Sequence, residues 1–189
     1  MKYQNRAPVQ IASGDLSDPV LAGHTRRALL LGATALGVFG CSRSKIRNIY
    51  RGPVADGVIV QKADRRLYVM RGETVLAAYE IDLGFAPFGH KGQRGDGRTP
   101  EGAYVIDRRN YNSEFFLSLG ISYPNEDDIA RAKEAGLNPG GDIFIHGGPR
   151  KWSQRGRPDW TAGCISVTDK QMEQIYQMVP DGTPIWINP

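Results

Sequence analysis

The chain has 189 residues, 40% hydrophobic and 23% charged, which suffices for one packed core, and its 23 Gly and 12 Pro favour strands and loops over a helical bundle. No apolar run reaches the roughly 20 residues of a spanning helix, which excludes a multi-span membrane protein, and two cysteines exclude a disulfide framework or a four-cysteine zinc site. Residues 1–50 carry seven basic and two acidic groups, so the remaining 17 basic and 18 acidic groups leave no excess positive charge for nucleic acid.

The first 41 residues are predicted to be an export leader. Arg26 and Arg27 stand directly before the apolar run 28–40, which resembles a twin-arginine export signal, and an ordinary secretion signal is the alternative. The run ends at Cys41 in a pattern that resembles a bacterial lipobox, so Cys41 is the candidate lipidated residue, with ordinary cleavage nearby as the alternative. A lipid there is the only membrane attachment we expect. Residues 42–56 are predicted to form a tether, and the protein to lie in the periplasm or cell envelope.

Cys164 is the only cysteine beyond this leader. Secretory compartments oxidise thiols, so an unpaired cysteine is a liability there unless its reactivity is used. We therefore expect Cys164 to be a reactive thiol.

Residues 57–188 are predicted to form a single mainly-β domain with two short helices. Three β-rich runs separated by short turns open this domain and predict a meander. The predicted strands are 58–62, 66–70, 75–83, 104–106, 143–145, 164–167 and 184–188, and the segment 115–122 is either a strand or irregular.

The two helices are predicted from their end signals. Residues 126–135 begin with acidic side chains and are followed by Gly136, a helix stop. Thr168, with Gln171 three residues later, predicts a capping box for the second helix. Apolar residues at helical spacing from Met172 to Val179 predict a core-facing stripe on that helix.

Two residues that could take part in catalysis lie at the ends of two short apolar strands. One strand leads into His146, and the other begins at Cys164. Side by side, the strands would place an imidazole within reach of a thiol, which could then be activated as a nucleophile. The backbone N–H groups of Gly163 and Cys164 could hold an oxyanion. The alternative is a buried structural cysteine and a satisfied core histidine.

These residues also carry a family resemblance. The ordered set Thr99-Pro100-Glu101-Gly102, His146-Gly147 and Gly163-Cys164-Ile165-Ser166-Val167 closely resembles the signature of the YkuD-type L,D-transpeptidases, over residues 57–188. The resemblance implies a β-rich catalytic fold, peptidoglycan stem peptides as substrates and a thioester at Cys164. It also implies His146 as general acid/base, oriented by a glycine carbonyl from Gly147 or its neighbour.

Ser166 departs from the common pattern of that family. Many members carry Arg two positions after the cysteine, and a hydroxyl cannot make the bidentate contact of a guanidinium. The sequence therefore most resembles the YafK-like branch, which includes hydrolases. Transfer, hydrolysis of stem-peptide linkages and a lipid-anchored binding module without activity all stay open.

Carboxylates of the substrate call for basic residues near the site. Cations lie between His146 and Cys164 and on the Gly-rich loop 84–99, where a cationic rim or solvated loop charge is expected. Three histidines without metal-ligand spacing predict no metal, and no cofactor is expected. The candidate substrate-binding residues are Arg150, Arg157, Trp160, Thr161, Ser166 and Arg98, with Lys91 and Arg94 on the same rim.

Overall fold

The structure is a computed structural model, and it describes residues 44–189. The predicted leader, with Arg26, Arg27 and Cys41, lies outside the described residues. The strands are β1 (Gly57–Gln61), β2 (Arg66–Arg71), β3 (Thr74–Glu80), β4 (Gly102–Asn110), β5 (Ser118–Ile121), β6 (Phe144–His146), β7 (Ile165–Ser166) and β8 (Pro184–Asn188). The helices are α1 (Glu126–Glu134), α2 (Asp169–Met178) and a short 3-10 turn, η1 (Trp152–Gln154).

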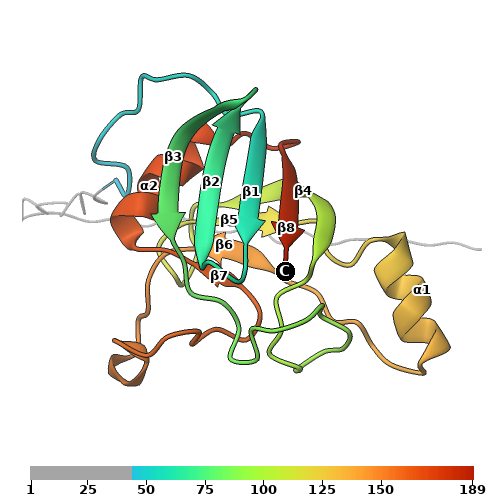
Figure 1. Cartoon of the computed structure of the whole chain (residues 1–189). Helices are drawn as coiled ribbons and strands as arrows, with labels where there is room; N and C mark the ends of the chain where they lie inside the picture. Colours follow the sequence, from blue (N-terminus) through green and yellow to red (C-terminus); the bar gives the residue numbers. More distant parts are fainter. Residues whose placement is uncertain (1–43) are drawn as a thin grey trace, which may run out of the picture. The chain divides into compact units, whose positions relative to one another are not determined.

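A single sheet runs through the domain in the order β3-β2-β1-β8-β4-β5-β6-β7. The predicted meander is confirmed, because β1, β2 and β3 pair antiparallel in sequence. The last strand, β8, inserts beside β1 and pairs with it in parallel. Figure 1 shows β3, β2, β1 and β8 in one layer, with β5, β6 and β7 behind it and the long β4 curling between the two. The mainly-β fold with two helices is thus as predicted.

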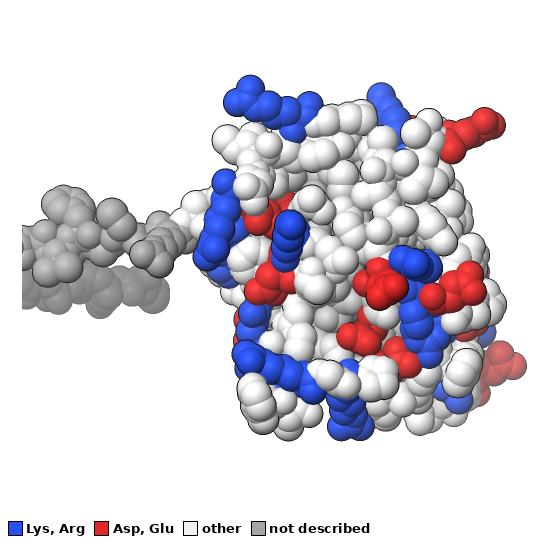
Figure 2. Space-filling view, turned by 60° about the vertical axis from the view of Figure 1, so that its left-hand side comes forward, with Lys and Arg blue, Asp and Glu red and all other residues white. Residues whose placement is uncertain are grey.

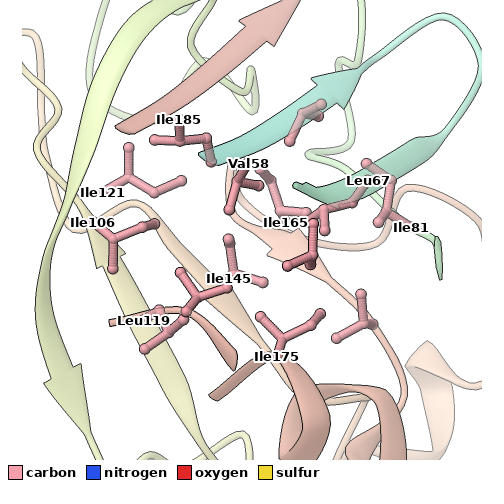
Figure 3. Close-up of a cluster of buried hydrophobic side chains, with 14 of the residues drawn as sticks. Val58, Leu67, Ile81, Ile106, Leu119, Ile121, Ile145, Ile165, Ile175 and Ile185 are labelled. Atoms are coloured by element: carbon pink, nitrogen blue, oxygen red, sulfur yellow. The ribbon is translucent and has the colours of Figure 1, made fainter. Parts of the chain in front are cut away.

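The core lies between the two halves of this curled sheet. Figure 3 shows Val58 and Ile185 from the first half facing Ile145 and Ile165 from the second, and all four are buried. Ile175 of α2 closes the cluster from the side. Each such side chain, removed from water, contributes about 1.5–3 kcal/mol, so β6 and β7 are held from their inner faces.

Both helices have the predicted end signals. Thr168 and Gln171 form the expected capping box of α2, and Asn125 and Asp128 form another at α1. Gly136 follows α1 with a φ of +67°, the left-handed conformation that favours glycine. Neither helix in residues 44–189 has the length and apolar run needed to cross a membrane.

Residues 44–56, predicted as part of a tether, pack on the domain as a strap. The backbone N–H groups of Arg47 and Asn48 donate to the Glu173 carboxylate of α2. Ala55 is buried, and its N–H donates to Met178 O at 2.9 Å. The segment is therefore fixed along α2 rather than free of the domain.

The strap also clamps the loop after β4. Lys45 Nζ donates to three backbone carbonyls of this loop, those of Tyr111 (2.9 Å), Ser113 (3.4 Å) and Phe116 (2.7 Å). Lys45 N donates to the Tyr111 hydroxyl at 2.8 Å. One lysine therefore holds residues 111–116 against the strap.

The Gly-rich loop that joins β3 to β4 is braced by two ion pairs. Lys62 is buried and pairs with Glu101 at 2.7 Å, and Lys91 is buried and pairs with Asp96 at 2.7 Å. Burial lowers the pKa of Lys62, against the effect of Glu101, which raises it. Asp96 also accepts from three backbone N–H groups of its own loop, so its carboxylate links the two ends of the segment 92–98.

Charge on the domain is mixed in sign. Figure 2 shows basic and acidic side chains interspersed over one face, as the nearly equal numbers of the two after residue 50 predict.

Candidate active site

The register of β6 and β7 sets the face on which His146 lies and the strand that follows Cys164. The strands run parallel, with Ile145 opposite Ile165 and His146 opposite Ser166. Because side chains alternate along a strand and both isoleucines point into the core, His146 and Ser166 share the other face. Cys164 directly precedes β7, two residues before Ser166, and we expect its side chain on that same face because the alternation continues back along the chain.

A carbonyl oxygen fixes the tautomer of His146. Nδ1 of the imidazole lies 2.7 Å from Gly147 O. A carbonyl only accepts, so Nδ1 carries the proton and, in the neutral ring, Nε2 is left as the acceptor. His146 is only 4% exposed, so few orientations are open to it.

Two aromatic rings hold the imidazole from its sides. The Phe115 ring lies 4.6 Å from that of His146, and the Trp160 ring lies 5.6 Å away at a steep angle. Gly147 N also donates to Phe115 O at 2.9 Å. The loop clamped by Lys45 therefore touches both the ring and the glycine that orients it.

The sulfur of Cys164 is held by backbone groups at the start of β6. The thiol donates to Asp142 O at 3.5 Å, and the Phe144 N–H points toward the sulfur. Asp142 has a φ of +57°, uncommon for a non-glycine residue. Cys164 is partly exposed and opens on a hollow of about 280 Å³.

The turn before Cys164 depends on Thr161 and Gly163. The buried Thr161 hydroxyl donates to Cys164 O at 2.7 Å and accepts from Gly163 N at 3.1 Å. Gly163 has a φ of +133°, and a Cβ there would stand 2.7 Å from Arg98 O. Glycine is thus required by both conformation and space.

The sequence predicted the N–H groups of Gly163 and Cys164 as a pair of oxyanion donors, and this turn leaves only one of them free of an internal hydrogen bond. The Gly163 N–H already donates to Thr161, whereas Cys164 N donates to no group within residues 44–189. Of the two, only the Cys164 N–H is therefore available to an incoming oxygen.

Burial shifts the pKa values of His146 and Cys164 in the directions that favour their uncharged forms. It lowers the pKa of His146, against a raising effect of the Gly147 hydrogen bond, and the charge of Arg150 lowers it further. Burial raises the pKa of the Cys164 thiol, against a lowering effect of the Phe144 N–H, and the charge of Asp142 raises it further. We expected the imidazole to activate the thiol, whereas burial shifts the pKa of the thiol at rest in the opposite direction, upward. Burial thus favours a protonated thiol and a neutral imidazole.

Ser166 lies below the histidine rather than in open solvent. It is 2% exposed, and its hydroxyl donates to Gly147 O at 3.4 Å, the same oxygen that orients His146. Its backbone pairs with Asp82 in both directions, at 2.8 and 2.9 Å. Ser166 therefore supports the glycine carbonyl, and it also lines a hollow of about 550 Å³.

Of the other predicted substrate contacts, one arginine is held in an ion pair and two are exposed to solvent. The guanidinium of Arg150 forms an ion pair with Asp169 in the first turn of α2, at 2.7 Å. This charge is therefore balanced within the domain. Arg98 is exposed and reaches His90 O at 3.4 Å. Arg157 is exposed and lines a second hollow, of about 320 Å³, beside Trp160. The Trp160 Nε1 donor is buried without a partner in residues 44–189.

Phe115 and Asp142 contact the two catalytic candidates and were not singled out from sequence. Phe115 lies 31 residues before His146 in an ambiguous segment, and Asp142 acts through its main-chain oxygen, which any residue has. Glycines at 140 and 141 directly before the strand were the available signal of a special turn. No three His, Cys, Asp or Glu side chains of residues 44–189 gather as a metal site.

Comparison with known proteins identifies the family. Residues 55–187 match the YkuD family, the L,D-transpeptidase catalytic domain. The chain belongs to this family, and the resemblance seen in its motifs is confirmed.

The similar proteins are about twice as long as the matched region. The chain is 26% identical to YafK of Escherichia coli (strain K12) over 142 residues, which is 73% of this chain and 52% of YafK. The crystal structure of the helical cell shape determining protein Pgp2 from Campylobacter jejuni is 26% identical, with a TM-score of 0.55, and covers 77% of this chain and 51% of Pgp2. Its K307A mutant is 25% identical, with the same TM-score. The chain thus spans about half the length of these relatives.

Proposed function

We propose that the protein is a cysteine acyltransferase of peptidoglycan, an L,D-transpeptidase acting on stem peptides. The observation that supports this is the parallel pairing of β6, which ends at His146, with β7, which directly follows Cys164, together with the contact of His146 Nδ1 with Gly147 O. Membership of the L,D-transpeptidase family supports the reaction class.

In the first step Cys164 is acylated by the stem peptide. Nε2 of His146 takes the thiol proton as Sγ attacks the carbonyl carbon of an L,D peptide bond. The Cys164 N–H donates to the developing oxyanion. The C–N bond then breaks, the histidine returns its proton to the leaving amine, and the thioester remains on Cys164.

In the second step an amine or water resolves the thioester. The attacking nitrogen or oxygen loses a proton to Nε2 and forms a bond to the carbonyl carbon. The C–S bond breaks, and the proton returns to sulfur. A neutral imidazole with a free Nε2 at rest suits both steps, because each begins with proton abstraction.

Hydrolysis is the second candidate, favoured by Ser166. Many family members carry a guanidinium where this chain has a buried, uncharged hydroxyl. A site with less positive charge binds a carboxylate-bearing acceptor more weakly. Attack of water on the thioester is then favoured over attack of the acceptor amine.

The cell envelope is the proposed location. The expected export leader at 1–41 supports it, and so does the extracytoplasmic position of peptidoglycan. A lipid at Cys41 would keep the domain at the membrane surface.

Mass spectrometry with tetrapeptide muropeptides tests the proposal. Incubation should yield an adduct on Cys164 equal to the stem peptide minus its terminal residue, and Cys164→Ala should yield none. Adding an amine acceptor separates crosslinked from hydrolysed product. No adduct and no turnover with folded protein, together with sacculus binding equal in Cys164→Ala, would instead identify a binding module.

A further inference from the structure

The loop that joins His146 to Cys164 presents an aromatic side chain to solvent in the turn η1. Trp152, the first residue of this turn, is 82% exposed, more than any other large hydrophobic side chain of residues 44–189. Backbone hydrogen bonds close the turn, with Arg155 N donating to Trp152 O at 3.1 Å. The indole is therefore held out by a hydrogen-bonded turn and adds little to the core.

Cations flank this indole, and no acid lies among them in the sequence. Lys151, Arg155 and Arg157 are exposed and form no ion pair within the part of the chain that the structure describes. The Arg155 guanidinium lies 5.3 Å from the centre of the Trp152 ring. Residues 150–158 contain no Asp or Glu. An exposed indole beside unpaired cations suits the surface of an anionic membrane, where indole rings lie at headgroup level and Lys and Arg bind acidic lipids.

The base of this loop is fixed beside the start of the strap. Arg150 Nε donates to Glu114 O at 3.3 Å, and Lys45 of the strap donates to Ser113 O at 3.4 Å. The strap and the base of the loop thus contact successive residues of the segment 111–116. Figure 1 shows the cyan strap and the orange turn η1 on the left-hand side of the domain.

The expected lipidation site is joined to this segment by a short length of chain. Ser44 Oγ lies 3.3 Å from the Tyr111 hydroxyl. Cys41 precedes Ser44 by three residue steps, which span at most about 11 Å of chain. A membrane that holds a lipid at Cys41 would therefore meet the domain near the segment that anchors the loop.

The acids next to the loop leave its cations in excess. Asp169 is paired with Arg150 at 2.7 Å, and Glu114 supplies one exposed carboxylate on the neighbouring segment. Three exposed cations remain against that single anion.

We propose that Trp152, with Lys151, Arg155 and Arg157, binds the surface of a membrane that contains anionic phospholipids. The indole enters the headgroup region, and the cations bind the acidic headgroups. The sequence predicted a lipid at Cys41 as the only membrane attachment, and this loop adds a second. A basic patch beside a lipid strengthens membrane binding, because the two attachments act together. The proposal does not depend on the thioester chemistry.

Stem-peptide carboxylates are the other anionic partner that these cations could bind. They would pair with the cations but would give the exposed indole no apolar layer to enter. Soluble muropeptides are therefore included in the test.

Tryptophan fluorescence of the full chain, measured with vesicles, tests the proposal. The three tryptophans are Trp152, Trp160 and Trp186, so the leader contributes no signal. We expect vesicles of phosphatidylcholine and phosphatidylglycerol to shift the emission to shorter wavelength, and phosphatidylcholine alone to leave it unchanged. Trp152→Phe should abolish the shift, whereas Trp186→Phe, which replaces a partly exposed indole of β8, should keep it.

Vesicle sedimentation measures the contribution of the charges. The double variant Lys151→Gln/Arg155→Gln should bind anionic vesicles more weakly, by about fivefold for each cation removed. Arg94→Gln/Lys133→Gln is the matched control, because it removes the same charge from exposed positions outside the loop, and it should bind as the wild type does. Every variant keeps the same leader, so the difference between the two reports the loop.

The outcomes separate this proposal from the proposed function. An emission unchanged by anionic vesicles, a shift that survives in Trp152→Phe, or equal binding of the two double variants overturns the membrane contact. A shift produced by soluble muropeptides and by no vesicle assigns the loop to the substrate and overturns it as well. Cys164→Ala should bind vesicles as the wild type does, so a failure of the thioester chemistry leaves the membrane contact in place.

Discussion

Replacing Lys45 by methionine tests whether the strap supports the candidate active site. The substitution keeps the aliphatic stem and removes the ammonium that donates to the carbonyls of Tyr111, Ser113 and Phe116. Hydrogen bonds from a charged donor contribute about 1.5–3 kcal/mol when well formed, and the partly exposed position favours the lower end. We expect the free energy of unfolding to fall by about 1–2 kcal/mol. For a domain of this size that is a loss of about 3–6 °C in Tm.

The same substitution of Lys45 should also change the pKa of His146. Phe115 lies in the clamped loop, with its ring 4.6 Å from His146 and its carbonyl bonded to Gly147. Loosening this loop exposes the imidazole, so the pKa of His146 should rise toward its ordinary value of 6.5.

Thermal unfolding and an NMR titration of the imidazole measure the two effects. Arg47→Met, which removes a neighbouring cation while keeping the strap's backbone bonds to Glu173, is the control. Equal Tm and equal His146 pKa in both variants would refute a supporting role for the strap.

Three further predictions follow from the site. Alkylation of Cys164 by iodoacetamide should keep accelerating above pH 9.0 in the native protein, because burial raises the pKa of the thiol, and a midpoint at or below that pH would contradict the burial argument. The free energy of unfolding, measured in urea, should fall as the pH drops below 6.5, because the unfolded chain then binds a proton that the buried His146 resists, and His146→Gln should flatten this dependence. Gly163→Ala should destabilise by about 2–4 kcal/mol through backbone strain and the contact with Arg98 O, whereas Gly156→Ala, at a φ of +72° with open space, should cost only about 1–2 kcal/mol.

Local patterns predicted the elements of the fold and the two central site residues. The meander, the capping box of α2 and the acidic start and glycine stop of α1 are set by alternation and by side chains within a few residues, as are the short strands that end at His146 and follow Cys164. Strand limits were less predictable. The expected strand at 104–106 extends over Gly102–Asn110, because its outer half is polar and exposed and lacks an apolar pattern.

Contacts between distant segments could not be predicted in the same way. Lys45 meets its carbonyls 66 to 71 residues further along the chain, and no local pattern encodes that meeting. Arg150 looked available for a substrate because its partner, Asp169, lies 19 residues away across a turn. The directions of the pKa shifts of His146 and Cys164 could not be predicted from the sequence either, because burial depends on how the whole chain packs.

The raised pKa of the Cys164 thiol bears on how an unpaired cysteine would persist at the proposed location in the cell envelope. Oxidants react with the thiolate, so a site that favours a thiolate at rest would expose Cys164 to continual oxidation. Here burial keeps the proton on sulfur, and the Asp142 carbonyl accepts it. In the proposed mechanism, attack requires transfer of that proton to Nε2 of His146 while the substrate carbonyl is in place. Under the proposed function, such a site gives up some intrinsic reactivity, and the thiolate would form only while a substrate carbonyl occupies the site.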